Sequence, residues 1–265
     1  MKHIVLIFIT SILFLHVSAQ KQIILESDFL NNPDTIWVFT PDSDSNESYP
    51  VLYLLHGWSG NFRMWHNMID CQYYANKYQF IIVCPDGLYD SWYINSPVES
   101  ENQYENFFNT ELIPAISQNF NVQEENIFIT GLSMGGHGSL YLFEKNPNYF
   151  KSAGSLSGLL DLTTWWYHYG INRVLGLTNQ NNKKDLLHKY SVTGNITNLK
   201  MVNKKIIVSC GTEDPFYDIN SSFIDSCSIN NIDVRFLQSP GGHNTTYWST
   251  AVNEHFNFFN SLISD

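Results

Sequence analysis

The sequence predicts an α/β domain built on a mainly parallel sheet of eight strands, with helices on both faces of the sheet. Short apolar runs rich in β-branched residues alternate with amphipathic stretches, which is typical of repeated strand–helix units. The chain has 265 residues, enough for one large domain with a well-buried core. No internal repeat or second hydrophobic module divides it, so we expect a single domain.

The strands are expected at eight apolar runs: 22–25, 35–39, 51–55, 80–84, 127–130, 152–156, 205–210 and 233–237. The first two flank the turn sequence NNPD and are expected to run antiparallel, ahead of the parallel part. Helices are expected after Gly60 and at 104–119, 135–146, 219–230 and 246–262. About 48 residues, 157–204, separate the sixth strand from the seventh, which is more than a routine connection needs. This insertion is predicted to cap the carboxyl edge of the sheet, where open α/β sheets bind ligands.

Residues 1–19 have the composition of a secretory signal peptide. A basic start precedes an apolar run, and small residues at Val17-Ser18-Ala19 fit a cleavage site before Gln20. The mature domain is then 20–265, and we expect it to be secreted or periplasmic. The alternative is a retained membrane anchor, although the apolar run is short for one.

Charge and cysteine content limit the possible partners. The formal net charge is −11, and about −12 once Lys2 is removed (13 basic against 25 acidic residues), so nucleic acid and anionic lipid are not expected partners. Cys84 and Cys210 each end a β-branched run and are expected to be buried free thiols. The sequence leaves open one bridge between Cys71 and Cys227. No spacing indicates a metal site, no cofactor is expected, and no pattern indicates an oligomeric state.

One short motif points to nucleophilic chemistry. Gly131-Leu132-Ser133-Met134-Gly135 follows a β-branched run and precedes a stretch with helix character. A serine on such a strand–turn–helix corner is exposed above the sheet as a nucleophile, and the flanking glycines relieve crowding in the turn. The alternative is an ordinary turn serine. Context favours Ser133 as the nucleophile.

The serine needs a base and an orienting carboxylate, and in this arrangement the acid precedes the histidine. His243 lies just beyond a predicted strand in a glycine-rich turn, which makes it the candidate base. Asp214 follows the preceding strand and comes before Pro215, which favours an extended or turn conformation there. Asp218 and Glu213 are the alternative acids.

The negatively charged intermediate also needs hydrogen-bond donors. The backbone N–H of Met134, directly after the nucleophile, is one candidate. The backbone N–H of Trp58, in the glycine turn that ends the third strand, is the other. Trp92, Tyr93, Trp165 and Trp248 fall on predicted loops or loop edges and are expected to contact substrate. The alternative is that several of these rings pack beneath the cap.

Several segments together resemble the putative-esterase family of α/β-hydrolases, in the expected order: LLHGWSGN, CPDG, DSWYINSP, ITGLSMGGHGSL, CGTEDPFYD and PGGHNTTYW. The resemblance spans the chain from about Leu25 to its end. It implies Ser133 as nucleophile, Asp214 as acid, His243 as base, and Trp58 and Met134 as oxyanion donors. The family includes S-formylglutathione hydrolases, tributyrin, feruloyl and acetylxylan esterases, and mycolyltransferases, and the exported carbohydrate-side esterases look most similar.

The sequence therefore predicts an exported serine carboxylesterase with an ester substrate, either an acylated polysaccharide or a small ester. Its aromatic content favours release of hydroxycinnamoyl groups such as ferulate from plant cell-wall polysaccharide. A broad short-acyl or acetyl esterase is the alternative, and an acyltransferase to sugar hydroxyls would use the same triad. A binding protein on a hydrolase scaffold is a third hypothesis, which the complete triad disfavours.

Overall fold

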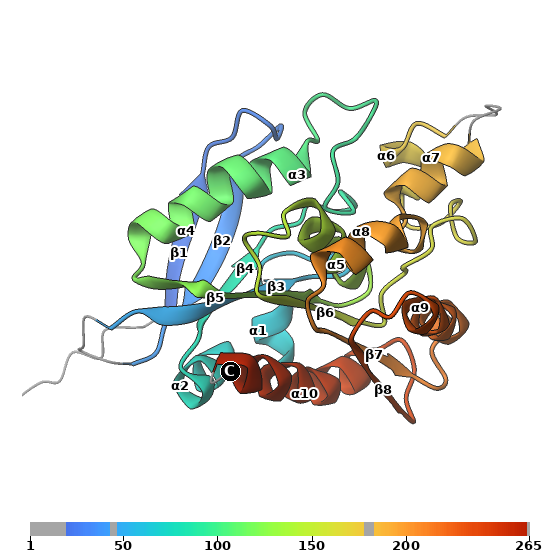
Figure 1. Ribbon diagram of the computed structural model, residues 1–265. Coiled ribbons are helices and arrows are strands. Elements are labelled where there is room, and N and C mark those ends of the chain that lie inside the picture. The colour runs from blue at the N-terminus through green and yellow to red at the C-terminus, as the bar shows by residue number, and fades with distance from the viewer. Residues whose placement is uncertain (1–19, 43–46, 178–182, 264–265) are drawn as a thin grey trace, which may run out of the picture.

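The computed structural model describes residues 20–42, 47–177 and 183–263, and in these it contains one eight-stranded sheet (Figure 1). The strand order is β1-β2-β4-β3-β5-β6-β7-β8. The strands are β1 (Gln20–Leu25), β2 (Asp34–Phe39), β3 (Tyr49–Leu55), β4 (Ile81–Pro85), β5 (Val122–Gly131), β6 (Ser152–Leu156), β7 (Ile206–Gly211) and β8 (Val234–Ser239). Only the β1–β2 and β2–β4 pairs are antiparallel. The predicted α/β fold, with its opening antiparallel pair, is confirmed.

Helices cover both faces of the sheet. They are α1 (Met64–Met68), α2 (Cys71–Tyr78), α3 (Tyr104–Phe107), the π-helical turn η1 (Phe108–Leu112), α4 (Ile113–Asn119), α5 (Met134–Lys145), α6 (Ile171–Val174), α7 (Lys183–Tyr190), the 3₁₀ turn η2 (Thr193–Asn195), α8 (Ile196–Val202), α9 (Tyr217–Ile229) and α10 (Thr245–Ile263). The helix expected at 104–119 is thus one continuous segment with a π-helical turn in its middle. The helices α1, α2 and α10 lie on one face, and α3, α4, α5, α8 and α9 lie on the other (Figure 1).

The alternating side chains of the central strand β3 divide the core into two layers. Val51, Tyr53 and Leu55 pack under α3–α5, α9 and the insertion, whereas Leu52 and Leu54 pack under α1, α2 and α10. All five are fully buried, as expected for a central strand covered on both sides. Burial of such side chains contributes about 1.5–3 kcal/mol each.

The cysteine distribution settles the possible bridge. All four cysteines are buried and free. Cys71 packs in the layer beneath α10, and Cys227 packs in the layer on the opposite side of the sheet. The bridge that the sequence left open between them is therefore absent, because the sheet separates the two thiols.

The long insertion is integrated into the main core. Its described parts, 157–177 and 183–204, contribute α6, α7, η2 and α8, and α8 packs against α5 and α9. Buried apolar side chains anchor it, among them Leu160, Ile171 and Leu199. Arg173 forms ion pairs with Asp90 and Glu99, which ties α6 to the segment that follows β4. The division into a domain and a cap remains a prediction.

The predicted signal peptide, 1–19, lies outside the described residues. Within the described residues, no helix combines the length and apolar character needed to cross a bilayer.

Candidate active site

Ser133 lies on a strained corner between β5 and α5. Its backbone has φ +53° and ψ −116°, a conformation that a non-glycine residue adopts at an energetic cost. Gly131 and Gly135 make the corner possible. A Cβ atom on Gly131 would lie 2.5 Å from the Gly135 carbonyl oxygen, and one on Gly135 would lie 2.6 Å from that of His56. The strand–turn–helix context predicted for Ser133 is therefore present.

The three predicted triad side chains meet above the sheet. His243 Nε2 lies 2.9 Å from Ser133 Oγ, and His243 Nδ1 lies 2.9 Å and 3.1 Å from the two carboxylate oxygens of Asp214. A proton on Nδ1 is held by the carboxylate, which leaves Nε2 free to accept the serine proton. The imidazole is partly exposed, with 21% of its side-chain surface accessible, whereas the Asp214 carboxylate is fully buried.

Asp214 is held from a second direction. The backbone N–H of Phe216 donates to Asp214 Oδ1 at 2.8 Å, so the carboxylate is oriented before it meets the histidine. The alternatives Glu213 and Asp218 are exposed. The Glu213 N–H donates to the Gly241 carbonyl at 2.9 Å, which joins the loop after β7 to the loop that carries His243. Of the three acids, the structure brings Asp214 to the histidine.

Two aromatic rings flank the His243 imidazole. Phe216 meets it edge-on with ring centroids 4.7 Å apart, and Trp248, in the first turns of α10, meets it at 4.8 Å. Both aromatic side chains are buried. They limit the rotation of the imidazole, so it stays directed at Ser133.

The expected oxyanion donors lie on either side of the corner. Met134 is the first residue of α5, where a backbone N–H has no acceptor within the helix. No hydrogen bond within the described part of the chain uses the backbone N–H of Trp58. The Trp58 turn abuts the corner, since a Cβ atom on Gly57 would lie 2.6 Å from Leu132 Cδ1 and 3.4 Å from Ser133 Cβ. Two unused donors therefore border the space above Ser133.

His56 supports this turn from beneath. Its Nδ1 donates to the Gly57 carbonyl at 2.8 Å, and its Nε2 accepts from the Gly87 N–H at 2.6 Å, which together require the neutral Nδ1–H tautomer. The Tyr93 hydroxyl donates to the His56 carbonyl at 2.9 Å. Tyr93 thus braces the oxyanion turn and is fully buried.

Trp92 is also a core residue. Only 2% of its surface is exposed, its Nε1–H donates to the Tyr169 carbonyl at 3.0 Å, and its ring packs edge-on against His137 at 5.4 Å. Both Trp92 and Tyr93 have positive φ values, 55° and 60°, and these turn the chain so that the rings point inward. The expectation that these two rings face a substrate is corrected by their burial, although the loop was placed correctly.

The other predicted aromatic residues belong to a band of rings beside the triad. Trp58 packs edge-on against Tyr89 at 5.1 Å and Tyr169 at 5.4 Å, and Trp165 lies 6.0 Å from Tyr169. Trp165 also contacts Phe216 at 5.2 Å, and Phe216 and Trp248 contact His243. Trp165 and Trp58 are half-buried, whereas Trp248 is buried. Tyr89, Tyr169 and Phe216 were not predicted from the sequence, although Phe216 lies within the motif that contains Asp214.

Neither His137 nor His255 forms a hydrogen bond with a triad side chain in the described part of the chain. Both are fully buried. Burial lowers the pKa of His137 to about 4 and that of His255 to about 3, so each stays neutral near pH 7. His137 contacts the Tyr190 carbonyl at 2.8 Å, which links α5 to the insertion. Within the described residues, His243 is the histidine that reaches Ser133.

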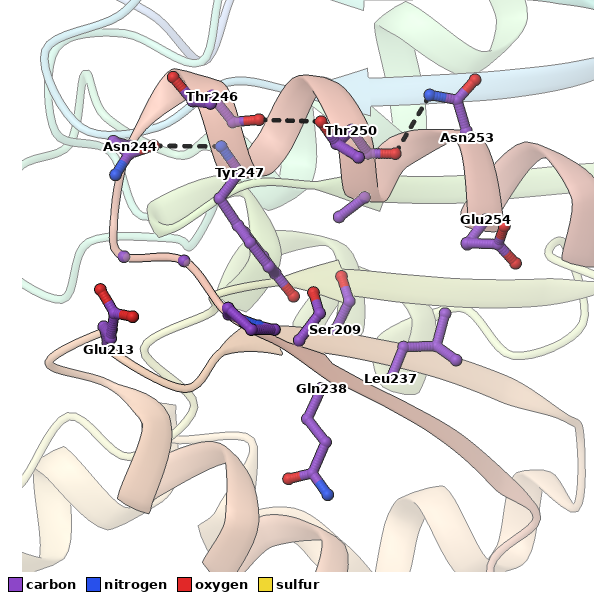
Figure 2. A pocket seen from close by; sticks show the side chains of 15 residues that line it. Ser209, Glu213, Leu237, Gln238, Asn244, Thr246, Tyr247, Thr250, Asn253 and Glu254 are labelled. Atoms are coloured by element: carbon purple, nitrogen blue, oxygen red, sulfur yellow. Dashed lines mark hydrogen bonds between the residues drawn. The ribbon is translucent and has the colours of Figure 1, made fainter.

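A pocket of about 770 Å³ lies behind the His243 loop, between β8 and α10 (Figure 2). Glu213, Gly242 and Asn244, which adjoin triad residues in the chain, line it, but no triad residue does. Its other walls include hydroxyl and amide side chains such as Thr246, Thr250 and Gln238 (Figure 2).

Comparisons with known proteins place the chain among esterases. The model of the Esterase family, described as "Putative esterase", matches residues 27–259. An acetyl esterase of Caldicellulosiruptor saccharolyticus is 28% identical over 86% of this chain and 88% of its own length. An S-formylglutathione hydrolase of Rattus norvegicus is 24% identical over 82% of this chain and 85% of its own.

Solved structures show the same fold. FphF, a fluorophosphonate-binding serine hydrolase of Staphylococcus aureus, superposes with a TM-score of 0.80 at 22% identity, covering 91% of this chain and 98% of its own. A ferulic acid esterase superposes with a TM-score of 0.75 at 24% identity, covering 91% of this chain and 97% of its own. At such identities the likeness shows the fold and not the substrate.

Proposed function

Because the chain belongs to the Putative esterase family, we propose that it is an exported serine carboxylesterase that releases hydroxycinnamoyl groups from plant cell-wall polysaccharide. The observation that carries the esterase chemistry is the hydrogen-bonded series Ser133–His243–Asp214 at the end of three neighbouring loops. The proposal goes beyond esterase activity in two respects: the hydroxycinnamoyl group as the acyl group, and export of the protein.

The geometry fits acyl transfer through a serine ester. His243 Nε2 takes the Ser133 proton while Oγ attacks the ester carbonyl carbon, and the carbonyl oxygen gains the negative charge. The N–H groups of Trp58 and Met134 bind that oxygen, each contributing about 3 kcal/mol. The C–O bond to the alcohol then breaks, and His243 returns the proton to the leaving oxygen. Water repeats the sequence to free the acid and Ser133.

The aromatic band supports a flat acyl group. Trp58, Trp165 and Tyr169 are half-buried rings beside the triad, and stacking against an aromatic acyl group contributes about 1 kcal/mol per contact. An acetyl group, by contrast, has no ring to stack and gains no such contribution. The burial of Trp92 and Tyr93 removes two of the rings that first favoured this substrate, so Trp58 and its neighbours carry the remaining support.

The experiment compares purified mature protein on methyl ferulate, p-nitrophenyl acetate and S-formylglutathione. Preference for methyl ferulate in kcat/KM, lost in Ser133→Ala by on the order of 10⁶ in kcat, supports the proposal. Cleavage of the acetyl ester or the thioester alone refutes the hydroxycinnamoyl part. Formation of new esters with added oligosaccharide would instead identify an acyltransferase.

A short-acyl esterase is the second candidate. The relative with 28% identity over most of both chains is named an acetyl esterase. The same three-substrate assay separates the two candidates. Export is tested by N-terminal sequencing of protein recovered outside the cytoplasm, where a start at Gln20 is expected and a start at Met1 would contradict a cleaved signal.

A further inference from the structure

A second histidine, His255, is buried between α10 and the sheet, below the loops that carry the triad. It lies on α10, the helix that begins at Thr245 directly after the His243 loop. Its side chain is fully buried in the layer between α10 and the sheet. α10 crosses β5, β6 and β7, and two of these strands, β5 and β7, lead into the loops that carry Ser133 and Asp214.

The imidazole bridges those two strands. Its Nδ1 lies 2.9 Å from Thr130 Oγ1 on β5, and its Nε2 lies 3.0 Å from Ser209 Oγ on β7. The strand between them, β6, has Gly154 at the crossing point. A Cβ atom on Gly154 would lie 2.6 Å from His255 Nδ1 and 2.8 Å from Thr130 Oγ1, so the ring fits only over a glycine.

The chemistry of the bridge requires a neutral imidazole. One ring nitrogen donates and the other accepts, and each hydroxyl can take either role, so both contacts are satisfied without a charge. Burial, together with the nearby positive charge of Arg235, lowers the pKa of His255 and keeps the ring neutral. Packing against Phe259, with ring centroids 6.2 Å apart, fixes its plane.

The same helix makes a further contact near its start. The Tyr247 side chain in the first turn of α10 reaches toward Ser209, and both residues line the pocket between β8 and α10 (Figure 2). The start of α10 therefore lies beside the same β7 residue that His255 contacts further along the helix.

We propose that His255 is a positioning residue for the triad, because its two hydrogen bonds fix the ends of β5 and β7 relative to the helix that follows His243. It touches neither the substrate nor a reacting atom, and it acts through Thr130 and Ser209. Loss of these hydrogen bonds should lower the rate strongly even though His255 does not touch the reacting atoms. A shift of about 1 Å between reacting groups costs on the order of 10²-fold in rate. The inference rests on the proposed serine-esterase chemistry, but not on the identity of the acyl group.

The central test replaces His255 by phenylalanine, which fills the site without hydrogen bonds, and by glutamine, which keeps one donor and one acceptor. With p-nitrophenyl acetate, we expect His255→Phe to lower kcat by about 10- to 100-fold while KM stays within threefold. We expect His255→Gln to restore kcat to within about fivefold of the parent. The rate of Ser133 labelling by a fluorophosphonate, in which Oγ displaces fluoride, should fall and recover in parallel.

The matched control is Phe256→Leu, which removes buried volume from the same helix where that ring packs against Tyr74 and Tyr78, away from the bridge. It should lower the melting temperature and leave kcat within threefold. If His255→Phe behaves like this control, or if the glutamine variant loses as much kcat as the phenylalanine variant, the positioning role is refuted.

The two hydroxyl partners provide an independent test if His255→Phe does not fold. The double variant Thr130→Val with Ser209→Ala removes both partners and leaves the histidine. A loss of kcat above tenfold at unchanged KM supports the bridge, and a kcat within threefold of the parent overturns it. A parent protein that neither hydrolyses p-nitrophenyl acetate nor reacts with the fluorophosphonate would overturn the proposed function itself.

Discussion

Replacing Asp214 by asparagine should move the proton of the neutral His243 ring from Nδ1 to Nε2. The Phe216 N–H holds one side-chain oxygen at 2.8 Å, and this contact requires an acceptor. The asparagine oxygen therefore stays there, and its NH₂ group takes the place of Oδ2, which lies 2.9 Å from His243 Nδ1. An NH₂ group donates, so Nδ1 must accept and the ring proton moves to Nε2. That nitrogen, 2.9 Å from Ser133 Oγ, can then no longer take the serine proton.

The expected cost is large because the wrong tautomer dominates. A triad in which the ring is held in this tautomer loses about 10⁴-fold in kcat, equivalent to about 5 kcal/mol of transition-state stabilisation. The assay is steady-state hydrolysis of p-nitrophenyl acetate at pH 7.5, with the fold checked by circular dichroism. KM should change little, since the carboxylate lies behind the histidine.

Asp218→Asn is the matched control, because Asp218 is an exposed carboxylate in the first turn of α9. It should retain kcat within threefold. Retention of more than 10% of the parent kcat by Asp214→Asn would refute the reasoning, and so would a comparable loss in Asp218→Asn, which would make Asp218 the acid.

Three further predictions concern the turn that carries Ser133 and two buried titratable side chains, Glu144 and His255. Gly135→Ala places a methyl group 2.6 Å from the His56 carbonyl oxygen, so fluorophosphonate labelling of Ser133 should slow by on the order of 10²-fold or more; an unchanged rate would contradict the crowding. Glu144 is buried without a hydrogen-bond partner, and burial raises its pKa to about 8 from an ordinary 4.5. Ionisation therefore destabilises the fold above about pH 4.5, and Glu144→Gln should raise the melting temperature at pH 8 but not at pH 4. The pKa of His255 is lowered to about 3, so its contribution to stability is present above about pH 6.5 and is lost as the pH falls, by about 1.4 kcal/mol per unit. Urea unfolding from pH 6 to 4 should consequently show a shallower loss in His255→Phe, and parallel curves would refute this.

The strands were predictable where burial on both sides leaves an unbroken apolar run. β6 has the predicted bounds, and most other strands differ from prediction by one or two residues at an end. β5 begins at Val122, well before the predicted start at 127, because Gln123, Glu124 and Glu125 leave the core and hide the strand in the pattern. Charged residues at an exposed strand end have the same appearance in a sequence as a loop.

The triad was predictable because catalytic loops follow strand ends, and the side chains of Ser133, Asp214 and His243 come from three such positions. The direction of the aromatic rings was not predictable. Trp92 and Tyr93 have positive φ values, and no sequence feature distinguishes a loop that turns its rings inward from one that turns them outward. Tyr169 and Tyr89 meet Trp58 only through tertiary packing between distant segments.

Two sets of residues therefore hold the triad in place: the loops that carry it, and the strand and helix residues beneath those loops. Sequence patterns reveal only the loops. Ser133, Asp214 and His243 lie on loops whose glycines and proline are visible as motifs, but loops alone do not hold three side chains in two successive contacts of 2.9 Å. The second set lies in the elements that carry those loops, where Thr130, Ser209 and His255 meet. These three residues occupy ordinary strand and helix positions, and the hydroxyl partners are 125 and 46 residues from the histidine in the chain. Because each hydrogen bond joins two different elements, a displacement of β5 or β7 that would open the 2.9 Å contact at Ser133 must first break a buried bond, at a cost of about 1–3 kcal/mol.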